Sequence, residues 1–168
     1  TIAHAIGEIG SDGDELRIMK TDDDASHYTI STALAPAWNN KEILITGANK
    51  DGEVDGTQVK IFGDVGGSAP ILNFASTKGE RSIWANIHFD ALDDSEHCVE
   101  TTSANHYIFW VNCRFSQATG HGVNRTGANY WSFINCRFDN NGGNGLLNTS
   151  TSFGIHYACV FDNNAGDG

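Results

Sequence analysis

The sequence predicts an all-β fold, a parallel β-helix with coils of about 23 residues and a short helical cap at its N-terminus. Three observations predict it. A Cys-x-Phe motif recurs at Cys113, Cys136 and Cys159, with 23 residues between successive copies. Apolar and polar residues alternate around each copy. Gly and Asn are abundant between the copies.

The alternation gives each copy one inward and one outward face. In a strand, successive side chains point to opposite sides, so each Cys and the Phe two residues later face inward. A coil of 23 residues has room for two or three short strands and tight turns. One coil cannot bury its own apolar face, so the coils must stack. The expected inward columns are Cys113, Cys136 and Cys159, and Phe115, Phe138 and Phe161.

Glycine and asparagine support sharp corners between the strands. The chain has 19 glycines, and 11 of its 16 asparagines lie beyond residue 100, where the clearest repeats are. Both residue types tolerate the left-handed backbone that such corners require. Asn141 and Asn164 each follow the inward Phe by three residues, which predicts a ladder of stacked side-chain amides.

The four cysteines are predicted to be reduced. Three of them occupy the same inward position of successive coils, and Cys98 lies in a different part of its coil. Three equivalent thiols cannot pair with one another, and the spacing contains no close Cys pair of the zinc-site type.

Two regions are expected. Residues 1–40 form an N-terminal cap, in which Ile30, Leu34 and Trp38 at positions i, i+4 and i+8 indicate a short amphipathic helix within residues 28–38. Residues 41–168 form the β-helix, beginning with short strands at 42–46, 59–62 and 70–74. Because the sequence stops within a coil, we expect the β-helix to be incomplete at the C-terminus or covered by another subunit.

This order of segments resembles the pectate-lyase-like superfamily of right-handed parallel β-helices. The resemblance rests on the helix-like segment, then "KEILITG", "TQVKIFGD", "PILNFAS", "SIWANIHFD" and the "NCRF" coils. It implies a right-handed solenoid. The superfamily includes pectin-degrading enzymes, bacteriophage tailspikes and other virion surface proteins, so the resemblance does not by itself choose a function.

A short motif favours an enzyme. Gly120-His121-Gly122 is similar to the Gly-His-Gly motif of polygalacturonase-type glycoside hydrolases, and the acidic pair Asp93-Asp94 lies one coil upstream. Such chemistry needs two carboxyl groups across a sugar bond, one as the acid and one to activate water.

The register and the missing motifs favour an ordinary corner instead. Aligning Cys98-Val99 with Gly122-Val123 brings Glu96 and His97 beside His121. The family's upstream Asn-x-Asp and downstream Arg-x-Lys are missing from their expected places. The alternative is therefore that His121 is an exposed turn residue.

Two further groups have a functional and a structural interpretation. Asp51, Glu53 and Asp55 alternate as in the first half of a calcium loop, but Phe62 occupies the twelfth position, which favours a solvated turn. Trp110, Tyr130 and Trp131 offer aromatic faces for stacking on a glycan, although some of them must pack in the core. No bound cofactor is expected, with calcium as the only candidate.

Charge and motifs together predict a structural protein. The formal net charge of −11 argues against nucleic acid and anionic membranes as partners. The N-terminus lacks a secretory signal pattern. We expect a decoration or tail component of a bacteriophage virion, a homotrimer whose partners are other copies of itself and other virion proteins, with a polysaccharide as a further candidate. The alternative is a secreted polysaccharide lyase or glycoside hydrolase.

Overall fold

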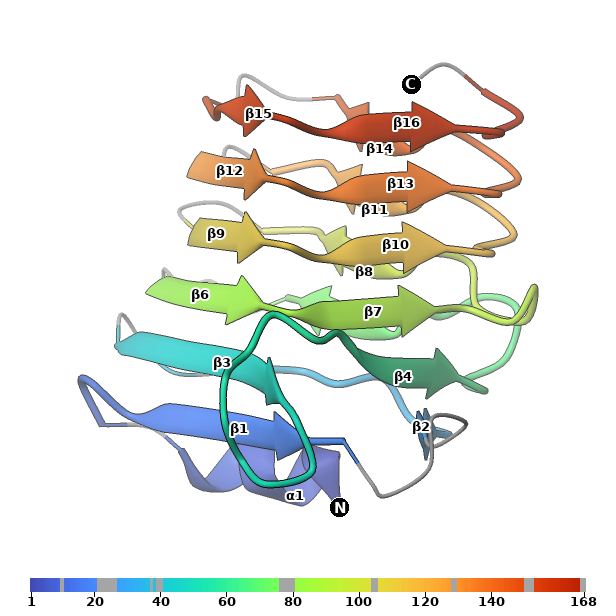
Figure 1. Ribbon diagram of the computed structural model, residues 1–168. Coiled ribbons are helices and arrows are strands. Elements are labelled where there is room, and N and C mark those ends of the chain that lie inside the picture. Colours follow the sequence, from blue (N-terminus) through green and yellow to red (C-terminus); the bar gives the residue numbers. More distant parts are fainter. Residues whose placement is uncertain are drawn as a thin grey trace.

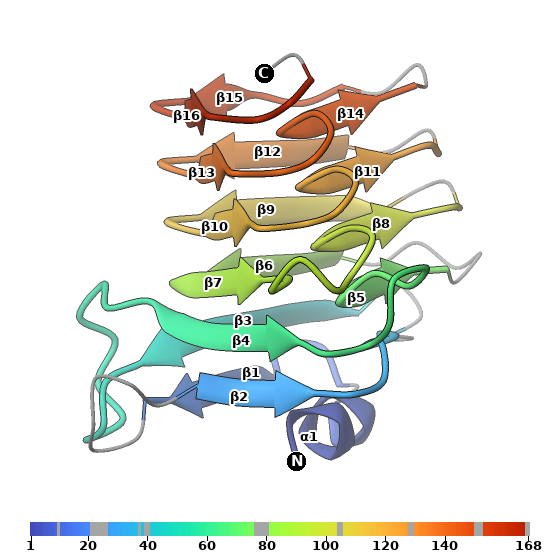
Figure 2. The ribbon, with the colours of Figure 1, turned by 90° about the vertical axis from the view of Figure 1, so that its right-hand side faces the viewer.

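The computed structural model describes residues 1–9, 11–20, 27–36, 38, 41–75, 81–103, 106–127, 130–149 and 153–166. Over these residues the chain winds into a parallel β-solenoid of stacked coils (Figure 1). Each coil runs along the front of the molecule, returns behind it and rises to the next coil. This path makes the solenoid right-handed, as expected (Figures 1 and 2).

Three parallel sheets form the walls of the solenoid. In spatial order, sheet A contains β1 (Glu15–Met19), β3 (Glu42–Ala48), β6 (Arg81–Ala85), β9 (Tyr107–Val111), β12 (Tyr130–Ile134) and β15 (His156–Tyr157). Sheet B contains β2 (His27–Ile30), β4 (Val59–Gly63), β7 (Ile87–Asp90), β10 (Arg114–Ser116), β13 (Arg137–Asp139) and β16 (Val160–Asp162). Sheet C contains β5 (Leu72–Phe74), β8 (Val99–Thr101), β11 (Val123–Arg125) and β14 (Leu146–Asn148).

The strand register confirms the predicted repeat. Phe115 is paired with Phe138 in the next coil, and Phe138 with Phe161. On the other side, Phe115 is paired with Phe89 across a longer interval of 26 residues. Their four rings stack with centroid separations of 5.7, 5.1 and 4.7 Å. The inward phenylalanines are therefore one continuous column in the core.

A second aromatic column and the cysteines complete the interior. Trp84 stacks on Trp110, and Trp110 on Phe133, at 5.7 and 6.2 Å. Cys113, Cys136 and Cys159 occupy the same corner of three successive coils, and all four cysteines are free thiols. Burial raises the pKa of the Cys113 thiol. The predicted thiol column is confirmed.

Asparagine ladders form at two corners. The Asn141 amide donates to Asn164 Oδ1 at 2.8 Å, which confirms the predicted ladder. A second ladder, which was not predicted from the sequence, lies at the corner between sheets A and B. There Asn86, Asn112 and Asn135 have left-handed backbones, with φ of 57°, 51° and 54°, and their side-chain amides bond from coil to coil.

The N-terminal helix lies elsewhere than predicted. Helix α1 (Ile2–Glu8) covers the first coil and buries Ile2 and Ile6, whereas the structure has no helix among the described residues of 28–38. Tyr28–Ile30 belong to strand β2, and Leu34 forms a parallel bridge with Leu72. The three apolar residues at helical spacing are all buried, but a strand and the bends after it bury them. Because β1 and β2 already pair within sheets A and B, the solenoid begins inside the region expected to be only a cap.

The three outer faces differ in chemistry. Sheet B carries a ladder of ion pairs, including Arg114 Nε to Asp139 Oδ1 at 2.8 Å and Arg137 Nη2 to Asp162 Oδ2 at 2.6 Å. The outward positions of sheet C hold polar residues in three successive strands, Asn73, Glu100 and Asn124. The outward positions of sheet A are largely apolar, as described below.

Candidate functional site

Some of the predicted site residues come together at the corner that precedes sheet C. We call Glu96, His97, Glu100, His121 and Asn124 the His–Glu corner. The predicted register holds, because Val99 pairs with Val123 and the rings of His97 and His121 stack at 5.2 Å. Glu100 and Asn124, which the sequence analysis missed, face each other in β8 and β11.

Hydrogen bonds fix both histidine rings from coil to coil. His97 Nδ1 accepts the backbone N–H of His121 at 3.0 Å, and His121 Nδ1 accepts the backbone N–H of Asn144 at 2.9 Å. An acceptor Nδ1 places the proton of a neutral imidazole on Nε2. In His97 this atom lies 3.8 Å from Glu96 Oε1.

Burial and a neighbouring charge change the pKa of one carboxyl group in the corner, that of Glu100. Burial raises the pKa of Glu100, and the nearby charge of Glu96 raises it further. The Asn124 amide donates to Glu100 Oε1 at 3.1 Å and acts in the opposite direction. Burial also lowers the pKa of His97 and of His121. The corner therefore favours neutral histidines beside one carboxyl group that holds its proton more tightly than usual.

The predicted acidic pair makes its contacts elsewhere. Asp94 Oδ2 accepts the backbone N–H of Gly66 at 3.0 Å. Asp93 has a left-handed backbone and lines a polar hollow of about 290 Å³ together with Asn140 and Asn163. The longer loop of this coil thus directs the Asp94 carboxylate to Gly66 and places Asp93 beside the polar hollow.

The acidic loop after β3 is held by its own hydrogen bonds. Asn49 Oδ1 accepts the backbone N–H groups of Asp51 and Glu53, and the Asn49 amide donates to Asp55. Asp51 pairs with Lys50, and the backbone N–H of Thr57 lowers the pKa of Asp55. In the described part of the chain, no group of three His, Cys, Asp or Glu side chains is placed to hold a metal ion.

The prediction of an aromatic platform for a glycan is wrong for Trp110 and Trp131. Trp110 and Trp131 are 0% exposed and belong to the core. Tyr130 is 45% exposed, but its ring lies between those of Tyr107 and Phe153, at 4.7 and 5.9 Å. A sugar ring can therefore reach only the edge of Tyr130. Position within the strand decides this outcome, because neighbouring aromatic residues point to opposite faces.

The exposed aromatic and aliphatic side chains gather on sheet A instead. We call the outward face of β3, β6, β9, β12 and β15, with the bridge residue Phe153 and the adjacent Ile155, the sheet-A face. Its large exposed members are Ile83, Tyr107, Phe109, Tyr130, Ile134, Phe153, Ile155 and Tyr157. Charge is found at one end, where Arg81 pairs with Glu42 at 3.4 Å and lies over the Tyr107 ring at 5.5 Å.

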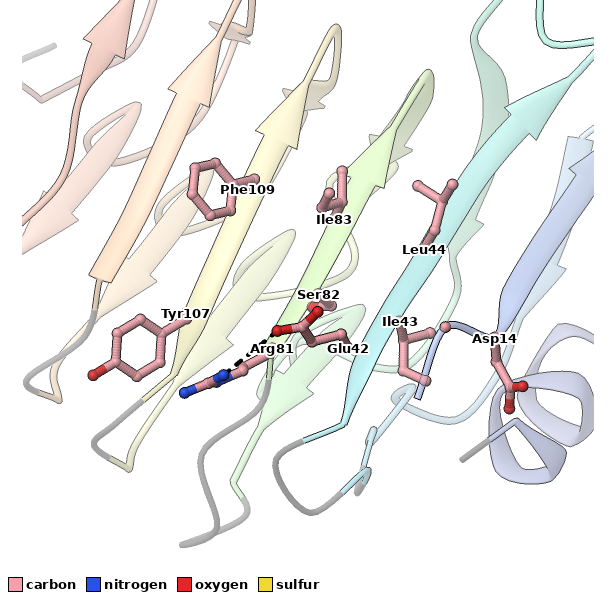
Figure 3. A pocket seen from close by; sticks show the side chains of 10 residues that line it. Asp14, Glu42, Ile43, Leu44, Arg81, Ser82, Ile83, Tyr107 and Phe109 are labelled. Atoms are coloured by element: carbon pink, nitrogen blue, oxygen red, sulfur yellow. Dashed lines mark hydrogen bonds and ion pairs between the residues drawn. The ribbon is translucent and has the colours of Figure 1, made fainter. Parts of the chain in front are cut away.

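A groove of about 420 Å³ hollows the first half of this face. Figure 3 shows Leu44, Ile83 and Phe109 side by side along it, with Arg81 and Glu42 at its edge. The second half, over β12 and β15, carries the most exposed rings, Phe153 and Tyr157, each 69% exposed. The same face thus presents a groove over its first half and highly exposed rings over its second half. The sequence did contain a signal for this face: alternation along the aligned strands of sheet A identifies which residues point outward.

Comparisons with known proteins find no match: no family model fits this sequence, and no curated protein is similar to it. Among the described residues, no helix is long and apolar enough to cross a membrane.

Proposed function

We propose that this chain is a structural component of a bacteriophage virion surface, a rigid β-solenoid that works by assembling through its sheet-A face. The observation that carries the proposal is the run of exposed apolar side chains across successive strands. Contiguous exposed apolar surface of this size marks an interaction site in most proteins. The resemblance to the superfamily that contains tailspikes adds the virion as the setting, as an analogy of fold.

The packing of the interior suits a rigid structural protein. Each coil contacts its neighbours through stacked rings, thiols and amide ladders, so the walls have little freedom to bend independently. The ion pairs of sheet B and the polar residues of sheet C keep the other two faces compatible with water. The acidic net charge favours solubility of the assembly.

Native mass and a glycan screen test this proposal together. We expect light scattering after size exclusion to give an oligomer, and incubation with acidic and neutral polysaccharides to release no reducing ends or unsaturated products. A monomer at all concentrations would contradict the proposal, and release of products from a glycan would favour the second candidate function.

A second candidate function is glycoside cleavage at the His–Glu corner. The observation that favours it is Glu100 near Glu96, because burial and the charge of Glu96 raise the pKa of Glu100, and a carboxyl group that keeps its proton can act as the acid beside a second carboxyl group. Glu100 would protonate the leaving oxygen, and Glu96, which is half exposed, would activate water.

Two matched variants test the second candidate. If a glycan is cleaved, Glu100→Gln should lower kcat by at least about 100-fold, since general acid catalysis contributes roughly 10²–10⁴-fold. Asp94→Asn is the control, because its carboxylate bonds to Gly66 outside the corner. Equal loss in both variants would point to damaged folding and exclude a role for Glu100 as the acid.

A further inference from the structure

We propose that a second copy of this chain packs its sheet-A face against this one about a twofold axis that runs along the strands, with β9 opposite β9. The inference rests on the proposed function and states how the assembly forms. It is carried by the chemistry of the three faces, the shape of the sheet-A face and the area it exposes.

Chemistry selects another sheet-A face as the partner. If this face met sheet B of a neighbour, the side chains of Arg114 and Arg137, which are 33% and 45% exposed, would lose water. Against sheet C it would cover Glu100 and Asn124. Burying such groups without new partners is unfavourable. Another sheet-A face presents no such groups over most of its area.

Symmetry then follows from contact between like faces. When the same surface is used on both copies, the interface is isologous and contains a twofold axis. A flat face can lie against its own copy over its whole extent only about such an axis in the plane of contact. Three copies about a threefold axis would leave much of each sheet-A face uncovered.

Shape selects the direction of the axis. The groove lies over β3, β6 and β9, and the most exposed rings lie over the strands after β9. An axis along the strands reverses the order of the coils in the second copy. It therefore places β12 opposite β6 and β15 opposite β3, so that the most exposed rings of each copy lie against the groove of the other.

The residues brought together by this axis are compatible. Phe109, 48% exposed, lies opposite itself at the centre. Leu44 meets Ile155 of the partner subunit. Arg81 meets the partner's Tyr130, which allows a cation–π contact like the one that Arg81 already makes with Tyr107. Strands β9 and β12 contribute no charged side chain to the outer face, since they contain none.

The exposed area is sufficient for a stable pair. The eight large side chains of the sheet-A face together expose roughly 600–1,000 Å², taking about 150–250 Å² for a whole large side chain. Interfaces of standard size bury about 800 Å² on each partner. The loop that follows β3, around residues 49–58, stands out from the corner between sheets A and B and bounds the contact on that side (Figures 1 and 2).

Three glutamate variants test the arrangement by sedimentation equilibrium over a range of concentrations. Wild type should be a dimer. Phe109→Glu should weaken association at least about 100-fold, because the axis places two like charges together. Tyr130→Glu has similar exposure but faces Arg81 of the partner subunit, so its association should stay within about tenfold of wild type. Leu147→Glu, on the outward side of sheet C, is the control and should associate like wild type.

A cysteine at the axis tests the symmetry directly. Under mild oxidation, Phe109→Cys should form a disulfide-linked dimer, whereas Leu147→Cys should not. Cys98, Cys113 and Cys136 are buried, and Cys159→Ala in both backgrounds removes the half-buried thiol. A stable trimer, or equal losses from Phe109→Glu and Tyr130→Glu, would overturn the twofold arrangement and leave the proposed function standing. A monomer at every concentration would overturn both.

Discussion

Single histidines carry the response of this protein to acid. His97 and His121 each accept a backbone N–H from the next coil through Nδ1. A protonated ring would turn that acceptor into a donor and break the contact between coils. Since burial lowers the pKa of both rings, the folded state favours their neutral forms.

His88 gives the most direct test of this response. Burial, with the charges of Arg114 and Lys60, lowers its pKa from 6.5 to about 3, against a smaller opposite effect of Asp139. A lowered folded pKa contributes stability above pH 6.5 that is lost as the pH falls toward 3. The loss per histidine is about 1.4 kcal/mol for each pH unit.

The variant His88→Gln should reduce the slope of the free energy of unfolding against pH by the contribution of about one proton. Its amide can replace the 2.7 Å contact between His88 Nε2 and Ser116 Oγ, so the fold should persist. Urea unfolding at pH 7.5, 6 and 5 measures the slope. His4→Gln, at an exposed position of α1, is the matched surface control. An unchanged slope in His88→Gln would contradict the assignment.

The sequence predicted single residues well where the repeat fixed their register. Alignment of Val99 with Val123 placed Glu96 and His97 beside His121, and the structure confirms it. The sequence did not predict that Trp110 lies in the core. Residue type does not show which face of a strand a side chain occupies, and only the alternation along the whole strand does. Glu100 and Asn124 were missed for the same reason: both are outward positions of three-residue strands, too short to show alternation.

At the scale of elements, the corners depend on left-handed residues. Asn112 combines a φ of 51° with hydrogen bonds from its amide to Gly56 O at 2.8 Å and to Asn86 Oδ1 at 2.9 Å. Asparagine adopts this backbone more readily than most residues. One side chain therefore ties the corner to the previous coil and to the loop after β3.

Changing these corners should shift stability in both directions. Asn112→Ala should lower the free energy of unfolding by about 2–3 kcal/mol, from left-handed strain of about 1 kcal/mol and lost hydrogen bonds of about 1 kcal/mol each. Ala158 occupies the equivalent corner with a φ of 53°. Ala158→Asn should therefore stabilise the protein by about 1 kcal/mol, as it extends the ladder from Asn135. Urea unfolding measures both, and a destabilised Ala158→Asn would contradict the ladder as the cause.

Element type was predictable where the pattern allowed one solution. The 23-residue period required short strands, whereas Ile30, Leu34 and Trp38 fit a helix and also a strand followed by bends. Tertiary pairing decided that case, since β2 forms the edge of sheet B and Leu34 bridges to Leu72. The short helix α1 has only two buried residues, too few for a clear helical period.

At the scale of the whole molecule, stability should be distributed along the stack. In a solenoid each coil contacts only its neighbours, so the total is close to a sum of coil and interface contributions. Phe115 lies between Phe89 and Phe138 and is fully buried. Phe161 contacts Phe138 and is 36% exposed.

The same substitution should therefore have unequal effects at the two positions. Phe115→Ala should lower the free energy of unfolding by about 3–5 kcal/mol, the usual loss for a buried phenylalanine. Phe161→Ala should lower it by about 1–2 kcal/mol, because less burial and one stacked neighbour are lost. Hydrogen exchange should then show faster opening of β16 in Phe161→Ala, with β7 and β10 protected as in wild type. Equal losses, or exchange that accelerates uniformly, would mean that the stack unfolds as one cooperative unit, because opening of the last coil would then be tied to opening of the central coils.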